Sequence, residues 1–363
     1  MKGRMTAKMP IPGNVISEAV LRYGRERDRY LELAARVADI SRRDIVEANA
    51  IRAQVTARAK SAKSFEGKLR RFAKRQDKDF PTVDVVFEQI GDFAGVRIAT
   101  WRPEDEARVA DEIQKRFFGP GGREVSVDKK DRLNVNGDSF YRATHCQVFL
   151  PEDELVGAYE NLKGASCEIQ VCSMMAHLWN EIEHDIGYKP GGGALQPNEK
   201  GLLEALGHLT RSGDAIITRL LEANEVRLEA QSGDFDDVYD FVARLRKVFS
   251  DADLSLHAGQ LFEEIQALGL TSMEKLKEAV GESNLNPGWA KQVIGQFNQI
   301  LRNKGHEDYS PNEDSSDLVL VLLLEKFAQK IEENHQAGRG VGRPPRIASI
   351  AKRFRQYRAD LRG

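Results

Sequence analysis

Apolar and polar positions alternate most clearly in residues 166–172. Cys167, Ile169 and Val171 point one way in this pattern, and Glu168, Gln170 and Cys172 point the other, which is typical of a half-buried strand. From residue 175 the period lengthens to that of a helix, with apolar residues at Met175, Leu178, Trp179, Ile182 and Ile186. A second stripe, on a neighbouring face, consists of His177, Glu181, His184 and Tyr188. The stretch therefore predicts a strand followed by a helix, with an apolar core stripe and a polar face.

The pattern before this stretch predicts an α+β fold. Residues 15–59 read as helical, and the strongly basic segment 58–78 reads as a further helix. A short helix, a turn and a strand follow in residues 85–101, then a helix in 103–118, a charged loop in 128–138 and a strand in 139–150. We expect a mixed β-sheet flanked by helices.

After residue 202 the pattern is entirely helical. A long helix, or a pair of helices, ends near Ser232-Gly233-Asp234, and five further helical patterns follow before a basic C-terminal tail. We expect one domain in residues 1–232 and an all-helical accessory region in residues 233–363.

Composition and charge limit the functional class only broadly. The 363 residues are 41% hydrophobic and 30% charged, and the net charge of -2 gives no overall attraction to nucleic acid. The N-terminus lacks the apolar core of a signal peptide, and the run LVLVLLL at 318–324 is shorter than the ~20 residues of a membrane span. We therefore expect a cytoplasmic protein with no membrane partner. The three cysteines fall in predicted strands and favour reduced core thiols; zinc, held with His177 and His184, is the alternative.

The candidate chemistry is that of phosphate. Asp92 and Glu168 would supply two carboxylates on rigid backbone, which is how Mg²⁺ is commonly held beside substrate phosphates. Cationic and hydroxyl donors suited to a polyphosphate are Arg58, Lys60, Ser64, Lys68 and Arg97. Tyr141, beside Arg142 and His145, offers an aromatic plane for a second base. Paired carboxylates also occur in glycosidases, but those sites do not need a dense basic helix. A solvated basic helix is the alternative for residues 58–78.

Five motifs in order carry a resemblance. They are Arg58-x-Lys60-xxx-Ser64-xxx-Lys68, Asp92-xx-Gly95-x-Arg97, Tyr141-Arg142-xx-His145, Glu168-Ile169-Gln170 and Glu183-His184-xxx-Tyr188-Lys189. Together they resemble the nucleotidyltransferase-like synthetase domain of the RelA/SpoT family over roughly residues 15–230. Too few residues precede Arg58 for the hydrolase domain of bifunctional members, so we expect a stand-alone synthetase and leave a homo-oligomer open.

The resemblance implies a reaction and assigns roles to the residues. Family members move the β,γ-pyrophosphate of ATP to a ribose 3′-hydroxyl, usually of GDP or GTP, which makes the alarmone (p)ppGpp. By resemblance, Arg58 and Arg97 would sandwich the adenine, and Lys60, Ser64 and Lys68 would hold the ATP phosphates. Asp92 and Glu168 would bind Mg²⁺ as the catalytic pair. The acceptor side would be formed by Tyr141, Arg142, His145, Gln170, His177, His184 and Lys189.

Departures from the family pattern keep the acceptor open. Phe140 stands where Gly is common, Cys172-Ser173 where Arg-Thr is common, and His177 where many small synthetases carry Asn or Asp. All three lie on the acceptor side. Two alternatives to (p)ppGpp synthesis therefore stand: a toxin-type enzyme that pyrophosphorylates the 3′ end of tRNA, and a non-catalytic nucleotide-binding sensor.

Overall fold

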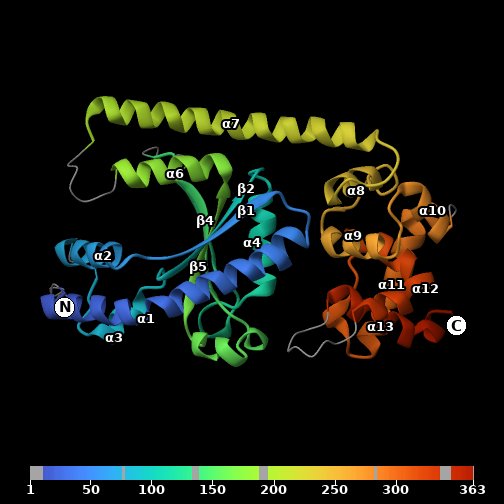
Figure 1. Ribbon diagram of the computed structural model, residues 1–363, viewed down its shortest axis with the longest axis horizontal. Helices are drawn as coiled ribbons and strands as arrows, with labels where there is room; N and C mark the ends of the chain where they lie inside the picture. Colours follow the sequence, from blue (N-terminus) through green and yellow to red (C-terminus); the bar gives the residue numbers. More distant parts are fainter. Residues whose placement is uncertain are drawn as a thin grey trace, which may run out of the picture. The chain divides into compact units, whose positions relative to one another are not determined.

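A computed structural model of the chain describes residues 11–75, 78–132, 139–187, 195–281, 284–335 and 345–362 (Figure 1). The chain forms two compact units, one made of Met1–Ile45 and Arg52–Ile217, the other of Val46–Ile51 and Thr218–Gly363. The first unit holds a sheet and its helices, and the second is helical, so the predicted α+β fold followed by an all-helical region is confirmed. The division falls within helix α7 (Pro197–Glu229), whereas the sequence places a boundary after this helix, at residue 232.

The first unit is built on one mixed, five-stranded sheet. Its strands are β1 (Ala53–Ala59), β2 (Ala94–Thr100), β3 (Val127–Asp131), β4 (Arg142–Phe149) and β5 (Ser166–Ser173), in the order β1-β2-β5-β4-β3. Strands β2 and β5 pair in parallel, and the other pairs are antiparallel. The stretch with the clearest alternation is therefore the central strand.

Different helices pack on the two faces of the sheet. One face carries buried apolar side chains such as Val96, Ile169 and Cys146, which lie opposite one another in the strand register. Helix α1 (Gly13–Ile40) packs along β1 and β2, and α4 (Asp105–Arg116) packs on β4 and β5. Helix α6 (Met174–Gly187) covers part of the opposite face (Figure 1). Ala176 of this helix packs in one buried cluster with Cys172.

Aromatic packing fixes the loop between β1 and helix α2 (Ala62–Arg75). The ring centroids of Tyr23 and Phe65 lie 5.2 Å apart, and each lies 5.1 Å from the ring centroid of Phe93. Helix α3 (Val83–Gln89) adds Phe87, stacked on Phe93 at 4.9 Å. The buried Tyr23 hydroxyl donates to the Lys60 carbonyl at 2.5 Å, so the cluster holds the backbone of a predicted site residue.

Three predictions for the first unit are wrong in detail. Residues 53–59 form a strand rather than the end of a helix, so Arg58 lies on β1 and Lys60 precedes α2. Residues 127–131 form an edge strand rather than part of a loop, and its charged side chains are typical of sheet edges. On α6, Leu178 and Ile186 are exposed while Trp179 is buried, so only part of the apolar stripe is core.

Helix α7 packs on α6 through small residues. The Trp179 indole donates to the Leu203 carbonyl at 3.0 Å, and Gly213 faces Met175. Gly207 lies directly against the Phe140 ring, where a Cβ atom would come within 2.2 Å of a ring carbon. The unusual Phe140 is therefore accommodated by a glycine on α7.

The second unit is a helical domain around a buried central helix, α12 (Asp317–Asn334), whose residues Leu318–Leu324 are all buried. Its other helices are α8 (Val238–Leu245), α9 (Ala258–Ala267), α10 (Met273–Val280), α11 (Pro287–Asn303), α13 (Arg346–Gln356) and α14 (Arg358–Arg362). Shorter helical turns along the chain are Ser41–Glu47, Pro120–Gly122, Glu152–Glu154, Gly157–Leu162 and Glu307–Tyr309.

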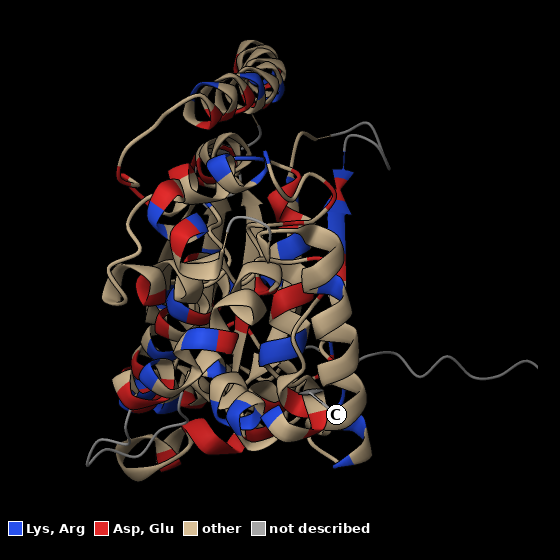
Figure 2. Ribbon diagram, turned by 90° about the vertical axis from the view of Figure 1, so that its right-hand side faces the viewer, with Lys and Arg blue, Asp and Glu red and all other residues tan. Residues whose placement is uncertain are grey.

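Surface charge on the helices of this unit is mixed. Lys and Arg alternate with Asp and Glu on the helices that face the viewer in Figure 2. In the basic tail, Arg355 pairs with Glu332 at 2.5 Å and Arg358 donates to the Glu325 carbonyl at 2.6 Å. Among the described residues no helix is both long and apolar enough for a membrane span, and the cytoplasmic location stays a prediction.

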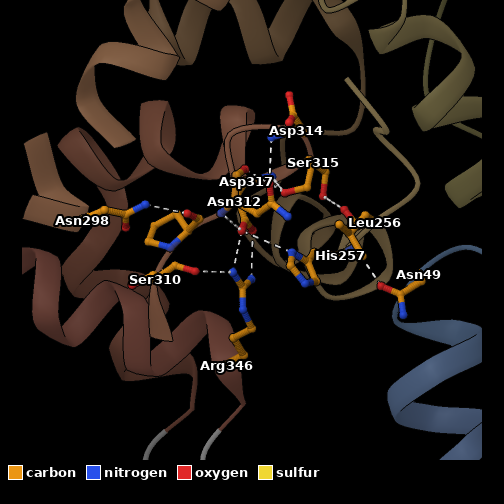
Figure 3. A network of polar contacts seen from close by, with 12 residues as sticks. Asn49, Leu256, His257, Asn298, Ser310, Asn312, Asp314, Ser315, Asp317 and Arg346 are labelled. Atoms are coloured by element: carbon orange, nitrogen blue, oxygen red, sulfur yellow. Dashed lines mark hydrogen bonds and ion pairs between the residues drawn. The ribbon is translucent and has the colours of Figure 1, made fainter. Parts of the chain in front are cut away.

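A buried polar network ties this unit together (Figure 3). Asp317, only 2% exposed, receives both Arg346 amino groups, the Asn312 backbone N–H at 2.8 Å and a contact from His257 Nδ1 at 3.2 Å. Burial alone would raise the pKa of Asp317, but Arg346 and His257 outweigh it and hold this pKa below its usual range. The His257 backbone N–H also donates to the Asn49 side chain at 3.0 Å, which anchors the segment Val46–Ile51 in the helical unit.

Replacing Arg346 with Met should therefore destabilise the helical unit by about 3–5 kcal/mol, because the Asp317 charge would stay buried without its main partner. Calorimetric unfolding of the full chain should show a lowered transition temperature. The matched control is Lys352→Met on the exposed face of α13, which should stay within about 0.5 kcal/mol of the wild type. Equal losses in both variants would contradict the assigned role of the network.

Candidate active site

Three neighbouring strands bring four of the predicted site residues, Arg97, His145, Glu168 and Gln170, onto the sheet face that α6 partly covers. The register sets Glu168 beside Gly95 and Gln147, and it sets Gln170 beside Arg97 and His145. Because β2, β5 and β4 are consecutive in the sheet, these side chains share one face without any special loop geometry. Residues far apart in sequence thus form one polar floor.

Asp92, just before β2, is the centre of a cationic cluster. Its Oδ2 atom lies 3.0 Å from Lys60 Nζ and 2.7 Å from Lys68 Nζ, while its Oδ1 atom is buried and has no hydrogen-bond partner among the residues that the structure describes. Burial opposes ionisation, but the two lysines outweigh it, so the pKa of Asp92 lies below its usual range. An ionised carboxylate with one unused oxygen can take a further cation.

The two predicted metal ligands are carboxylates, whose oxygen atoms suit Mg²⁺. Asp92 and Glu168 interact electrostatically, since the charge of Asp92 opposes ionisation of Glu168. Within the described ranges no group of three or more His, Cys, Asp or Glu side chains is arranged to hold a metal. A hard cation here would thus take two protein carboxylates and draw its other ligands from water or phosphate, as Mg²⁺ commonly does.

A hydrogen-bonded chain links Glu168 to Tyr141. His145 Nδ1 lies 3.2 Å from Glu168 Oε1, and His145 Nε2 lies 2.7 Å from the Tyr141 hydroxyl. Burial would raise the pKa of Glu168, but the bonds from His145 and Gln170 outweigh it, so Glu168 is an ionised acceptor. His145 Nδ1 therefore carries a proton, and with a neutral ring Nε2 accepts from Tyr141. Burial, together with the charge of Glu168, raises the pKa of Tyr141 to about 12, which keeps its hydroxyl protonated.

The Arg97 guanidinium is held at its edge by three neighbours. Its Nη1 atom lies 2.7 Å from Glu181 Oε1 and 3.1 Å from His177 Nδ1, and its Nη2 atom donates to Gln170 Oε1 at 3.4 Å. Because a guanidinium only donates, His177 Nδ1 accepts and must be unprotonated. Burial and the positive charge of Arg97 both lower the pKa of His177, in agreement with this tautomer.

Sequence reasoning assigned no role to Glu181. Its Oε1 atom also lies 3.9 Å from Arg58 Nη1, so one carboxylate spans the two arginines expected to hold a base. The available signal was its place four residues after His177, on the same helical face. Gln147 is a second residue without an assigned role; it donates to the Gly91 carbonyl at 2.9 Å and so supports the turn before Asp92.

Other predicted residues lie apart from this cluster. Arg142 is held by the buried carboxylate of Asp214 on α7 and lies 3.5 Å from the Ser173 hydroxyl. The exposed Ser64 lies one turn before Lys68 on α2, and the Ser61 hydroxyl accepts from the Ser64 backbone N–H at 3.1 Å. His184 is exposed near the end of α6, and Lys189 is outside the described residues. His177 contacts Arg97, a predicted donor-side residue.

The cysteines do not form a site. Cys146, Cys167 and Cys172 are buried free thiols, and burial raises the pKa of Cys146 and of Cys172 to about 12. Their environment is that of protonated core thiols. The zinc alternative has no support among the residues that the structure describes.

Comparison with known proteins places this cluster in a family. Residues 57–193 match the family model described as "Region found in RelA / SpoT proteins", and every predicted site residue falls within that match. This part of the chain is similar to that RelA/SpoT region. The resemblance read from the five motifs is confirmed. The region's curated relatives include GTP pyrophosphokinase YjbM of Bacillus subtilis, 28% identical over 179 residues that cover 49% of this chain and 72% of that protein.

Solved structures similar to the RelA/SpoT region cover about half of this chain. A GTP pyrophosphokinase family protein from Streptococcus pneumoniae aligns with a TM-score of 0.43 and 23% identity, over 56% of this chain and 94% of its own. Small alarmone synthetase 1 from Bacillus subtilis aligns with a TM-score of 0.42 and 22% identity, over 56% and 98%.

The tautomer of His177 predicts a pH dependence of stability. Since the folded state lowers the pKa of His177, the contribution of the neutral ring is complete above its ordinary value of 6.5 and is lost as the pH falls toward the lowered pKa. A His177→Gln variant keeps an acceptor for Arg97 without titrating, so it should lose less stability than the wild type between about pH 7.5 and 5. Denaturant midpoints at several pH values measure this difference. An identical pH profile in wild type and His177→Gln would refute the assignment.

Proposed function

We propose that the chain is an ATP-dependent pyrophosphokinase that transfers the β,γ-pyrophosphate of ATP to the ribose 3′-hydroxyl of GDP or GTP and so makes (p)ppGpp. The observation that carries this proposal is the Asp92 cluster, in which two lysines converge on one carboxylate that keeps an unused oxygen and interacts electrostatically with Glu168. The similarity to a GTP pyrophosphokinase supports the same reaction class.

The donor side follows from the cationic residues. Lys60 and Lys68 would neutralise the ATP phosphates, with the Ser64 hydroxyl one turn away on α2. Arg58 and Arg97 would stack on the adenine, and the contacts of Arg97 with Gln170 and His177 give it a fixed plane for that purpose. We therefore move His177 from the acceptor side to the support of the donor base.

The transfer step needs alignment more than covalent chemistry. The acceptor's 3′ oxygen attacks the β-phosphorus of ATP, the bond from that phosphorus to the α,β-bridging oxygen breaks, and AMP leaves with the electron pair. Asp92 and Glu168 would hold Mg²⁺, which when bound neutralises charge on the phosphates. Glu168 is ionised and accepts from His145 and Gln170, so we assign it to metal binding first and to removal of the hydroxyl proton second.

The acceptor side is built on Tyr141. Its ring would stack on the guanine, while its hydroxyl bond to His145 fixes the ring relative to Glu168. Arg142, bonded to Asp214, would act by positioning β4 against α7. His184 and Lys189 stay predicted acceptor contacts.

Transfer to the 3′ end of tRNA is the second candidate, because it would use the same donor site. The outer face of α2 carries the exposed cations Lys63, Lys74 and Arg75, which suit a polyanionic partner. A non-catalytic sensor is less well supported, since both carboxylates are held in ionised form, Asp92 by two lysines and Glu168 by its hydrogen bonds from His145 and Gln170.

A transfer assay with the purified 363-residue chain, Mg²⁺ and ATP labelled in the γ-phosphate decides between these candidates. Label passing to GDP or GTP supports the proposal, and label passing only to tRNA refutes it in favour of the second candidate. ATP binding without transfer to any of the three acceptors indicates the sensor. Chelation of Mg²⁺ should abolish transfer, and adding Mg²⁺ back should restore it.

Removing either carboxylate charge should stop the reaction. We expect Asp92→Asn and Glu168→Gln each to lower the rate of transfer by at least roughly 10²–10³-fold, because each would lose a metal ligand and a fixed charge. The comparison is Asp84→Asn, which removes an exposed carboxylate paired with Arg22 and should leave the rate unchanged. Turnover near the wild-type rate in both site variants would exclude the metal assignment.

Two substitutions separate the roles of Tyr141. Tyr141→Ala removes the stacking plane and should raise the KM of the acceptor about 10- to 100-fold, with little effect on the KM of ATP. Tyr141→Phe keeps the plane and loses only the bond to His145, so it should lower kcat more than it raises the acceptor KM. Equal changes in both KM values for Tyr141→Ala would contradict stacking on the acceptor.

A further inference from the structure

A carboxylate lies at the edge of both arginines that would bind the donor base. Glu181 Oε1 is 2.7 Å from Arg97 Nη1 and 3.9 Å from Arg58 Nη1. The Glu181 side chain is 47% exposed and the Arg58 side chain 62%, so this group borders solvent where a ligand can enter. No step of the proposed reaction uses Glu181.

The position of Glu181 leaves the faces of the Arg97 guanidinium available. Guanidinium N–H groups lie in the plane of the group, so partners at the edge bind in that plane while a ring stacks on the face. Glu181, His177 and Gln170 all contact terminal amino groups of Arg97. They therefore fix the plane on which a flat, uncharged ring can stack.

Charge gives Glu181 a second effect. Two guanidinium groups side by side, without a counter-ion, would attract phosphate as strongly as a base, because Arg binds phosphate with paired hydrogen bonds. One carboxylate shared between Arg58 and Arg97 offsets part of that charge and repels phosphate oxygens. Burial opposes ionisation of Glu181, but Arg97 and Arg58 outweigh it, so the carboxylate is charged.

The Asp92 cluster offers the contrasting environment. There two lysines share one carboxylate that still has an unused oxygen for a metal, so the cluster keeps its attraction for a metal-bound polyphosphate. The Lys60–Lys68 pair can thus bind a metal-bound polyphosphate, whereas the Arg58–Arg97 pair favours a flat, uncharged ring.

We propose that Glu181 is a positioning residue that makes the Arg58–Arg97 pair a site for the base and excludes phosphate from it, so that ATP binds in one direction with its phosphates at Lys60 and Lys68. This inference rests on the proposed donor site, but its test reads binding and does not depend on transfer.

Two variants separate charge from orientation. Glu181→Gln keeps an oxygen that can accept from Arg97 and removes the charge, so affinity for inorganic triphosphate should rise several-fold at low salt and return toward the wild-type value at high salt. Glu181→Ala removes both functions and should also weaken ATP binding about three- to tenfold, because the stacking planes lose their support. Glu204→Gln, on an exposed position of α7, removes the same charge elsewhere in this unit and is the matched control.

Calorimetric titration of the full chain with ATP and with inorganic triphosphate, at two salt concentrations, gives all of these values. Triphosphate affinities that are the same in Glu181→Gln and in Glu204→Gln overturn the proposal. So does ATP binding in Glu181→Ala that equals the wild type. If the wild type binds ATP but transfers nothing, the proposed reaction fails while these comparisons still decide the role of Glu181.

Discussion

The parallel pairing of β2 with β5 is the constraint on which the site depends. This pairing joins strands far apart in the chain and sets Arg97 opposite Gln170 and Gly95 opposite Glu168. Side chains alternate between faces, so a slip of one residue would turn Glu168 and Gln170 into the core and bring Ile169 to the polar face. The apolar contacts of Val96, Ile98 and Ile169 on the opposite face make such a slip costly. The hydrophobic core therefore fixes the polar geometry.

Much of this arrangement could be predicted because the signals were local. The alternation in residues 166–172 placed Glu168 and Gln170 on one face, and the motif spacing assigned Asp92, Lys60 and Lys68 to one site, where the structure brings them into contact. Strand β1 could not be predicted, because its exposed edge residues Gln54, Thr56 and Arg58 carry little apolar periodicity, and its pairing with β2 decides its conformation. Glu181 was missed because its importance arises from contacts with β1 and β2, which no pattern within α6 records.

Two carboxylates divide the cations of the site between them. Asp92 holds the two lysines, and Glu181 holds the two arginines. Flexible cationic side chains lose conformational freedom when they bind a ligand, and a carboxylate that already orders them reduces that loss. The aromatic cluster around Phe93 extends this order to the backbone, since Lys60 donates its own N–H to the Phe93 carbonyl at 3.0 Å. The acceptor side is ordered differently, through the hydrogen bond between the Tyr141 hydroxyl and His145.

The segment Val46–Ile51 has a consequence for how this chain is made. These six residues belong to the helical unit, where Asn49 accepts from His257 and the Ala48 carbonyl accepts from the Gly259 backbone N–H at 3.0 Å. During synthesis they leave the ribosome before the RelA/SpoT region, whereas their partners leave after it. The helical unit therefore cannot complete its core until the last third of the chain has emerged. For the same reason, cutting the chain after α7 does not isolate a finished domain: it removes His257 and Gly259, the hydrogen-bond partners of Asn49 and Ala48, from a segment that lies immediately before the strand that carries Arg58.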